Sequence, residues 1–334
     1  MRVKREELLR SLEAVAPGLA RKEIVEQSSC FVFRDGKVVT FNDEVAVAAD
    51  TPLVIVGAVP GQPLLALLRK MIEDEIDVDL CDGELVVKGK GRRAGIRVEA
   101  EVSLPVDAIE QPEEWKPLPG DFVDAVGVVA GCVSGDESQF VLTCVHVHPE
   151  CLEACDNYQL CRYPLVTGIK EPTLIRGESL RYVVGLDAVE FAETKGWVHF
   201  RNATGTVLSC RRWVERFPSL DDLLKVQGTR TVLPKGLVEA VAKAEIFSGE
   251  DVVANRVTVE LRDNRLKVEG RGPSGWYAEQ KKLEYGGEPM RFVTLPKMLV
   301  ELAKRGNECE VAEGKLKVDG GKWTYVTATS APGD

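Results

Sequence analysis

The chain has 334 residues, of which 44% are hydrophobic and 29% are charged. This is the composition of a globular protein, and at about 100–150 residues per domain it allows two or three hydrophobic cores. No stretch approaches the roughly 20 apolar residues needed to cross a bilayer. The N-terminal segment MRVKREELLRSLEA also lacks the apolar core of a signal peptide. We therefore expect a cytoplasmic protein without membrane spans.

The net charge of −10 arises from 43 Lys and Arg residues against 53 Asp and Glu residues. It excludes a protein that coats nucleic acid with its whole surface, because phosphate binding requires a basic face. A protein that is acidic outside and basic along one restricted surface is still compatible with this charge. The nine cysteines follow no framework spacing, so we expect free, mostly buried thiols in a reducing compartment.

One unit recurs along the chain, an amphipathic helix followed by several short strands. In the first round, apolar residues at helical spacing predict helices over 4–16 and 62–73. Alternating patterns and turn residues such as Asp82-Gly83 predict the strands. These strands are expected over 30–35, 37–42, 44–50, 76–81, 84–89 and 94–102.

The same pattern then starts again twice. The second round predicts helices over 121–131 and 178–186, with strands over 139–147, 151–155, 158–163, 188–193, 197–202 and 205–213. The third predicts helices over 235–246 and 297–304, with strands over 256–263, 265–270, 276–283, 308–313, 315–320 and 324–329. Both helices of the third round follow a Leu-Pro pair, as expected for Pro near the first helical position.

Six half-units of about 50–60 residues predict three similar domains. The expected boundaries are 1–108, 109–224 and 225–334, with Pro-rich joining segments over 103–119 and 216–234. Helices arrive at intervals rather than after every strand, so the fold class is α+β, with two helices per domain packed on antiparallel sheets. Basic residues such as Arg69, Lys70 and Lys297 lie on the predicted helices. Mixed charge on exposed helix faces is common, so charge alone leaves their role open.

Several segments resemble the bacterial β sliding clamp, the β subunit of DNA polymerase III. They are REELLRSLEAVAPGLARK (5–22), CDNYQLCRYPL (155–165), RRWVERFP (211–218) with TVLP (231–234), KAEIFSGED (243–251) and the terminal TYVTAT. Their order and spacing match the family over essentially the whole chain. The resemblance implies a homodimer of three-domain chains that closes into a pseudo-sixfold ring around duplex DNA. It implies a processivity factor rather than an enzyme, with no cofactor, no metal and no catalytic residue. The implied partners are double-stranded DNA, a DNA polymerase, a clamp loader and a second copy of the chain.

The resemblance also assigns residues to three sites. Those expected to contact DNA are Arg10, Arg21, Lys22, Arg69, Lys70, Arg181, Lys235 and Lys297. A pocket for partner peptides with Leu and Phe anchors, between domains two and three, would be lined by Cys155, Asn157, Tyr158, Gln159, Leu160, Pro218, Val326 and Ala328. The subunit contact would place Ile246 and Phe247 of domain three against a domain-one strand that contains Glu99 and Glu101.

The chain departs from the family at several of these positions. Asn157, Tyr158 and Gln159 stand where the family has Gly-His-Arg, and Ala328 lies near the place of a terminal Met. Glu99 and Glu101 fall where apolar residues are usual. The chain is also shorter than typical members, which suggests a divergent or viral version with a different peptide preference and a more polar dimer contact.

Two other classes of function are compatible with parts of the sequence. The run LTCVHVHPECLEACDNYQLC (142–161) contains the ligand types of zinc, but it has no Cys-x-x-Cys pair. The alternating Asp77, Asp79 and Asp82 could hold Mg²⁺ in a nuclease, although such rows are usually solvated strand faces. A repeat-built interaction scaffold that never meets DNA is the third class considered.

Overall fold

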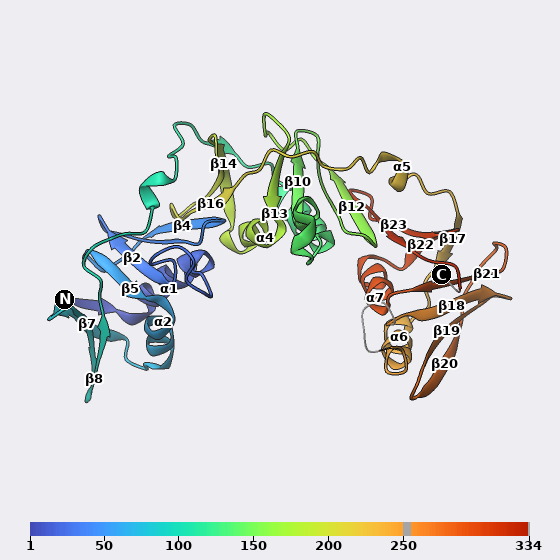
Figure 1. Ribbon diagram of the computed structural model, residues 1–334, viewed down its shortest axis with the longest axis horizontal. Coiled ribbons are helices and arrows are strands. Elements are labelled where there is room, and N and C mark those ends of the chain that lie inside the picture. The colour runs from blue at the N-terminus through green and yellow to red at the C-terminus, as the bar shows by residue number, and fades with distance from the viewer. Residues whose placement is uncertain (250–254, 333–334) are drawn as a thin grey trace. The chain divides into compact units, whose positions relative to one another are not determined.

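A computed structural model describes residues 1–249 and 255–332 of the chain (Figure 1). Glu250 and Asp251, the end of the segment KAEIFSGED, lie outside the described residues. The chain divides into two compact units, one formed by 1–130 with 167–215 and the other by 131–166 with 216–334. None of the described helices is long and apolar enough to span a membrane.

Unit 1 contains four helices of eight residues or more: α1 (Arg5–Val15), α2 (Gly61–Lys70), α3 (Phe122–Val129) and α4 (Gly177–Leu186). One of its sheets has the order β1 (Arg2–Lys4), β6 (Glu75–Cys81), β7 (Glu84–Gly89), β8 (Arg92–Arg97). The other has the order β5 (Gly57–Pro60), β2 (Cys30–Arg34), β3 (Lys37–Phe41), β4 (Val45–Asp50), β16 (Val207–Arg211), β15 (Trp197–Asn202), β14 (Ala188–Glu193), β9 (Lys116–Pro117). A further short strand is β13 (Thr173–Arg176).

Unit 2 contains α5 (Asp221–Leu224), α6 (Leu237–Glu245) and α7 (Pro296–Arg305). Its longer run of strands is β10 (Cys144–His148), β11 (Cys151–Cys155), β12 (Gln159–Pro164), β24 (Thr324–Ala328), β23 (Lys315–Asp319), β22 (Glu308–Ala312), β17 (Thr229–Val232). The second sheet has the order β20 (Gly275–Lys282), β19 (Arg265–Gly272), β18 (Val257–Arg262), β21 (Met290–Thr294). Short 3-10 turns cover Ala16–Gly18, Val106–Ala108, Ala130–Cys132 and Glu137–Thr143.

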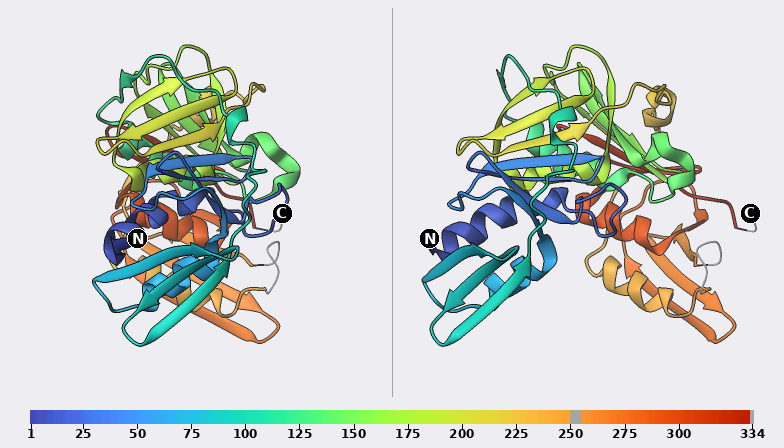
Figure 2. Two further views of the ribbon diagram at one scale, coloured as in Figure 1. Left: turned by 90° about the vertical axis from the view of Figure 1, so that its left-hand side faces the viewer. Right: turned by 60° about the vertical axis from the view of Figure 1, so that its left-hand side comes forward.

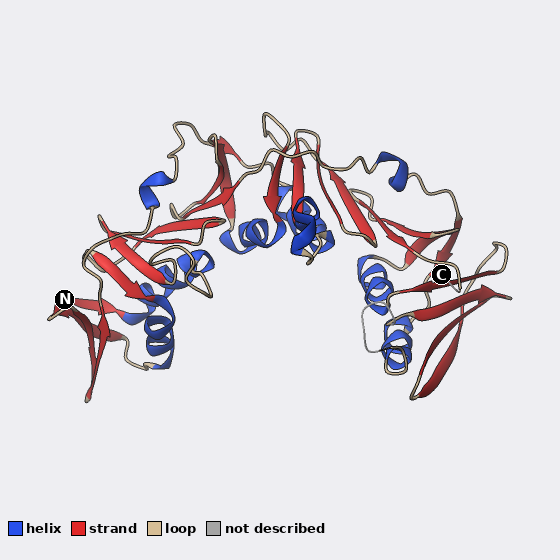
Figure 3. Cartoon of the chain, viewed as in Figure 1, coloured by secondary structure: helices blue, strands red, loops and turns tan. Residues whose placement is uncertain are grey.

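Within each unit the helices of eight residues or more lie on one face of the sheets, whereas the single turn of α5 lies outside that helical layer (Figure 3). The reason is their apolar stripes: α1 buries Leu8, Leu12 and Val15, and α2 buries Leu64 and Leu68. The helices pack in pairs, α1 with α2, α3 with α4, and α6 with α7. The blue pair α1 and α2 and the orange pair α6 and α7 can be followed in Figure 2. The α+β class and the two helices per repeat that the sequence predicts are confirmed.

Sheets run across both of the expected domain boundaries. In unit 1, β4 pairs antiparallel with β16, with Val47 opposite Leu208. In unit 2, β12 pairs antiparallel with β24, with Leu160 opposite Val326. Because these pairings join segments from neighbouring repeats, the segment 109–224 contributes to both compact units. The expected boundaries at 108 and 224 mark where the sequence pattern starts again. The extent of the compact units depends instead on which strands pair with one another.

Two predicted strands were wrong in extent. The strand predicted over 139–147 begins only at Cys144, because Glu137–Thr143 forms 3-10 turns in which the Thr143 hydroxyl donates to the Phe140 carbonyl at 2.6 Å. The strand predicted over 94–102 ends at Arg97. Beyond it, Glu99 exchanges two backbone hydrogen bonds with Ala58, of 2.8 and 3.0 Å, which draws the chain toward β5.

His199 is a buried imidazole on β15 of unit 1. It is 1% exposed, its Nδ1 lies 2.8 Å from Ser209 Oγ and its Nε2 lies 3.0 Å from Thr194 Oγ1. Burial lowers the pKa of His199 to about 4, because the charged ring would lose its hydration. The neutral ring is therefore the form that the fold accommodates.

We expect His199 to make the stability of the protein depend on pH. The unfolded chain binds a proton near pH 6.5 and the folded chain only near pH 4, so the free energy of unfolding falls as the pH drops through this window. The full loss is about 3 kcal/mol, and the contribution is fully present above pH 6.5. Denaturant titrations of the wild type and of His199→Asn would measure it. The difference between the two proteins should shrink from pH 7.5 to pH 4, and a constant difference would contradict the assignment.

Candidate functional site

The eight basic residues expected at DNA are all exposed side chains. Six belong to unit 1 and two to unit 2: Arg10, Arg21, Lys22, Arg69, Lys70 and Arg181, and Lys235 and Lys297. Four of these residues lie on α1, α2 and α4, one on α7, and the others in the loops beside α1 and α6. Within each unit these residues therefore lie on or beside the helical face of the sheets.

The helical face of each unit is close to neutral. The four longer helices of unit 1 carry five Lys and Arg residues against five Asp and Glu residues, and α6 and α7 of unit 2 carry four against three, although the whole chain has a net charge of −10. Some of the cations are paired, as in Arg69 Nε with Glu13 Oε1 at 2.9 Å and Arg10 with Glu6 at 3.6 Å. Exposed pairs of this kind are worth little and exchange readily. The helices therefore lack the acidic excess of the whole chain, which would repel phosphates.

An apolar cavity of about 360 Å³ lies in unit 2, where β12, β24 and the segment 216–224 meet. All eight residues predicted for the peptide pocket line it: Cys155, Asn157, Tyr158, Gln159, Leu160, Pro218, Val326 and Ala328. The prediction missed further lining residues: Leu142, Asp156, Leu220, Leu223, Gly314 and Lys315. Leu220 and Leu223 could have been found from the sequence, because apolar residues three positions apart indicate a helical turn with one buried face. The surrounding segment otherwise resembles a linker.

Strand pairing builds the floor of this cavity. Leu160 lies opposite Val326 in the β12–β24 register, and Gln159 lies opposite Thr327. The pairing continues past the strand end, where the Tyr158 carbonyl accepts from the Ala328 N–H at 2.7 Å. Residues more than 160 positions apart in the sequence are thereby held side by side.

Gln159, which stands where the family has Arg, is fixed at one end of the cavity. Its side-chain oxygen accepts from the Tyr325 hydroxyl at 2.9 Å, and its Nε2 donates to Asp156 Oδ2 at 3.1 Å. Asp156 also accepts the backbone N–H of Tyr158 at 2.7 Å. The ammonium of Lys297 lies 5.9 Å from the centre of the Tyr158 ring. One of the expected DNA contacts thus lies at the rim of the cavity, beside an aromatic residue.

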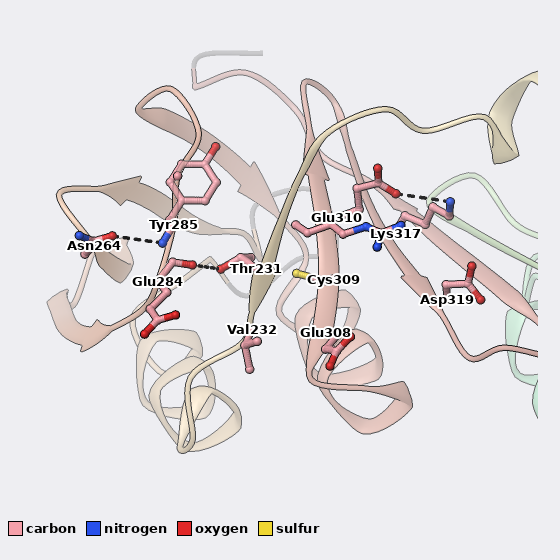
Figure 4. A pocket seen from close by; sticks show the side chains of 12 residues that line it. Thr231, Val232, Asn264, Glu284, Tyr285, Glu308, Cys309, Glu310, Lys317 and Asp319 are labelled. Carbon is pink, nitrogen blue, oxygen red and sulfur yellow. Dashed lines mark hydrogen bonds and ion pairs between the residues drawn. The ribbon is translucent and has the colours of Figure 1, made fainter.

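A larger cavity of about 600 Å³ in unit 2 has the opposite character (Figure 4). It lies between β17 and the residues after β20, and Thr231 Oγ1 bridges its walls by donating to the Glu284 carbonyl at 2.6 Å. Its lining includes four carboxylates, those of Glu284, Glu308, Glu310 and Asp319. Such a polar, acidic lining does not suit the Leu and Phe anchors of a peptide, so the smaller apolar cavity is the candidate peptide site.

The residues expected at the subunit contact lie beside two outermost strands. Ile246, 71% exposed, and Phe247 follow α6 near β20, where the Phe247 ring carbons lie 3.5 Å from the position of a Cβ on Gly275. The end of α6 comes this close because β19 has glycine at 270, where a Cβ would lie 1.8 Å from the Ala244 carbonyl oxygen. Trp276, 61% exposed on β20, adds a second large apolar side chain.

Glu99 and Glu101 lie after the end of β8 rather than on it. The Gln27 amide donates to the Glu99 carboxylate at 2.8 Å and to the Glu101 carbonyl at 2.8 Å. Both glutamates are exposed. They therefore accept hydrogen bonds from within unit 1, whereas the strand edge itself is provided by Arg92–Arg97.

The geometry of the described residues gives little support to a zinc site or to a Mg²⁺-dependent nuclease site. Among residues 1–249 and 255–332, no three His, Cys, Asp or Glu side chains gather as metal ligands would. In the Cys/His run, His146 Nδ1 lies 2.8 Å from Glu153, and the Cys161 thiol contacts the Arg305 guanidinium at 3.8 Å. In the acidic row, Asp79 is paired with Lys88 at 2.7 Å and with the N-terminal ammonium at 3.1 Å. These two cations, with Lys88 the larger influence, lower the pKa of Asp79.

Comparison with solved structures identifies the fold. The DNA polymerase III β subunits, or DnaN sliding clamps, of Pseudomonas aeruginosa and Bartonella birtlesii, both bound to griselimycin, superpose with TM-scores of 0.82 and 0.85 at 16% and 15% identity. The β subunit of Thermotoga maritima gives a TM-score of 0.82 at 16% identity. Each comparison covers 98% of both chains. No family model and no curated protein matches the sequence.

The architecture is therefore that of a three-domain clamp. At 12–17% identity, the chain has the fold of the bacterial β sliding clamp and a strongly divergent sequence.

Proposed function

We propose that the chain is a DNA sliding clamp, a non-catalytic processivity factor of the cytoplasm. Two copies, each with domains at 1–108, 109–224 and 225–334, would close into a ring around duplex DNA. The ring would tether a replicative polymerase and be placed on DNA by a clamp loader. The fold shared with bacterial DNA polymerase III β subunits over 98% of the chain supports this function.

The carrying observation is the matching of strand edges between repeats. The meanders β2–β3–β4, β10–β11–β12 and β18–β19–β20 are equivalent, and so are β6–β7–β8, β14–β15–β16 and β22–β23–β24. Strand β4 pairs with β16, and β12 pairs with β24. In each of these pairings the last strand of a meander of the first set pairs with the last strand of a meander of the second set. The remaining last strands are β20 of the first set and β8 of the second, and neither is paired in this way.

The two remaining edges are complementary by the same rule. Strand β20 of one copy can pair with β8 of a second copy as β4 pairs with β16. Each copy offers one edge of each kind, so the contact is head-to-tail, and two such contacts close a dimer. Closure also covers edges that would otherwise favour aggregation.

The weak charge of the helical face suits a clamp better than a tight DNA-binding protein. Phosphate contacts carry no sequence information, and their strength falls with salt. A closed ring is held by topology and needs only a modest attraction to slide. The exposed Arg21, Lys22, Lys70 and Lys235 are the contacts we propose beside the paired Arg10 and Arg69.

The apolar cavity is the site we propose for partner peptides. Exposed lining residues such as Tyr158 and Leu223 offer apolar surface to Leu and Phe anchors. Partner proteins would share this one site, and therefore compete for it. The neutral Gln159 in place of the family's Arg favours peptides that lack an acidic group at this position.

Mass and DNA retention together test the proposal. Light scattering should give about twice 36.7 kDa. For retention, the protein is diluted until the dimer dissociates, mixed with nicked circular DNA and reconcentrated, so that no loader is required. We expect retention on circles at high salt and rapid loss when a restriction enzyme linearises them. A monomer, or equal retention on circular and linear DNA, would contradict a topological clamp.

A further inference from the structure

The segment 217–224 forms one wall of the apolar cavity without being part of a sheet. Pro218, Leu220 and Leu223 are its lining residues. Its regular structure is the single turn of α5, in which the Leu224 N–H donates to the Leu220 carbonyl at 3.0 Å. We refer to residues 217–224 as the strap. A wall of this kind keeps its shape only if side chains hold it in position.

Two side-chain contacts fix the strap on either side of Pro218 and Leu220. On one side, the Phe217 ring stacks on the His146 ring with centroids 4.8 Å apart and planes at 20°. On the other, Asp221 Oδ1 accepts from Arg162 Nη1 at 2.7 Å. Phe217 is 9% exposed, so the stacking is shielded from water.

A buried carboxylate orients both of these partners. Glu153 is 5% exposed, and its two oxygens lie 2.8 Å from His146 Nδ1 and 2.6 Å from Arg162 Nε. His146, Glu153 and Arg162 lie directly opposite one another in the register of β10, β11 and β12. They form a cross-strand row, which we call the Glu153 row, whose ends both point to the strap.

We propose that the Glu153 row is a positioning device that holds the strap and thereby sets the affinity of the cavity for partner peptides. The row makes no contact with the cavity itself, since none of its three residues lines it. It acts through Phe217 and Asp221. This inference rests on the proposed peptide-binding function of the cavity.

Asp221 is the position for the first test because its side chain is 65% exposed and its loss does not open the core. We expect Asp221→Ala to weaken binding of a fluorescent peptide carrying a Leu-Phe pair by about 5-fold, mainly through faster dissociation. Asp221→Glu keeps the carboxylate and should restore the affinity to within about 2-fold. The matched control is Asp222→Ala, on the same turn, which removes only a pair with Lys225 and should bind like the wild type.

Hydrogen exchange of the strap provides a second measurement that needs no peptide. In Asp221→Ala and in Glu153→Gln, amides 217–224 should exchange at least several-fold faster than in the wild type, whereas in Asp222→Ala they should not. Unchanged exchange in the first two variants would overturn the positioning role. Equal peptide affinity of Asp221→Ala and the wild type would overturn it as well. A wild type that binds no peptide but shows the exchange pattern would refute the proposed peptide site and leave the strap contact established.

Discussion

Replacing Ile246 and Trp276 together by glutamate is expected to convert the proposed ring into monomers and to abolish retention on circular DNA. Both side chains are large, apolar and mostly exposed, at 71% and 61%. They lie at or beside β20, the outermost strand of its sheet in unit 2. This is the strand that we propose pairs with β8 of a second copy. Two large apolar side chains placed beside the same open strand edge form the kind of patch that a partner commonly covers.

The size of the effect follows from the burial that the ring would provide. Fully burying a side chain of this size contributes about 1.5–3 kcal/mol, and a buried, unpaired carboxylate adds a further cost. The dissociation constant of the dimer should therefore rise by about 100-fold or more. Light scattering as a function of concentration measures this change, and the DNA assay with circular and linear templates shows its consequence.

Val232→Glu is the control for surface charge as such. Val232 is 50% exposed on β17, which belongs to neither of the two closing edges. This variant should remain dimeric and stay on circles. The double variant should still bind the Leu-Phe peptide, because no residue of the cavity is changed. A dimer that survives the double substitution would exclude the β20–β8 closure.

The sequence predicted the repeated elements better than their ends. The helix predicted over 62–73 ends at Lys70 in the structure, and the Arg5 side chain explains this end by donating to the carbonyls of Leu68 and Glu73. Such a cap comes from a residue more than 60 positions away, so no local pattern contains it. In the misassigned strand at 139–147, β-branched and aromatic residues favoured a strand. Local bonds, such as Asp136 Oδ1 accepting from the Ser138 N–H, favour turns instead.

The candidate peptide site was accessible only through the resemblance. Leu160 and Val326 are brought together by the pairing of β12 with β24, and neither strand's periodicity specifies its partner. The Glu153 row was overlooked for a different reason. His146 lies in a run whose Cys and His content suggested zinc, whereas its ring is used for packing on Phe217. Residue type indicates the available chemistry, but the neighbours decide which part of it is used.

Placing two carboxylates in the apolar cavity, in Tyr158→Asp with Leu223→Asp, is expected to weaken peptide binding by about 100-fold or more. Tyr158 and Leu223 are 38% and 45% exposed, so the change affects the cavity surface rather than the core. A Leu or Phe anchor would then have to displace water from two carboxylates, and loss of a central hot spot alone costs about 2–4 kcal/mol. Fluorescence anisotropy with the Leu-Phe peptide measures the loss.

This variant should lose peptide binding and keep the dimer, whereas the Ile246 and Trp276 variant should lose the dimer and keep peptide binding. Its ring edges are intact, so the dimer should form and remain on circular DNA, yet a polymerase should no longer be retained on the template by it. Val189→Asp, 48% exposed on β14 of unit 1, serves as the control and should behave as wild type. If peptide binding survived in the cavity variant, partners would have to bind elsewhere on the chain. If circle retention were lost together with peptide binding, the two sites would not be separable. The proposed clamp mechanism requires the separation, because the ring would supply the topological link and the cavity would supply the tether.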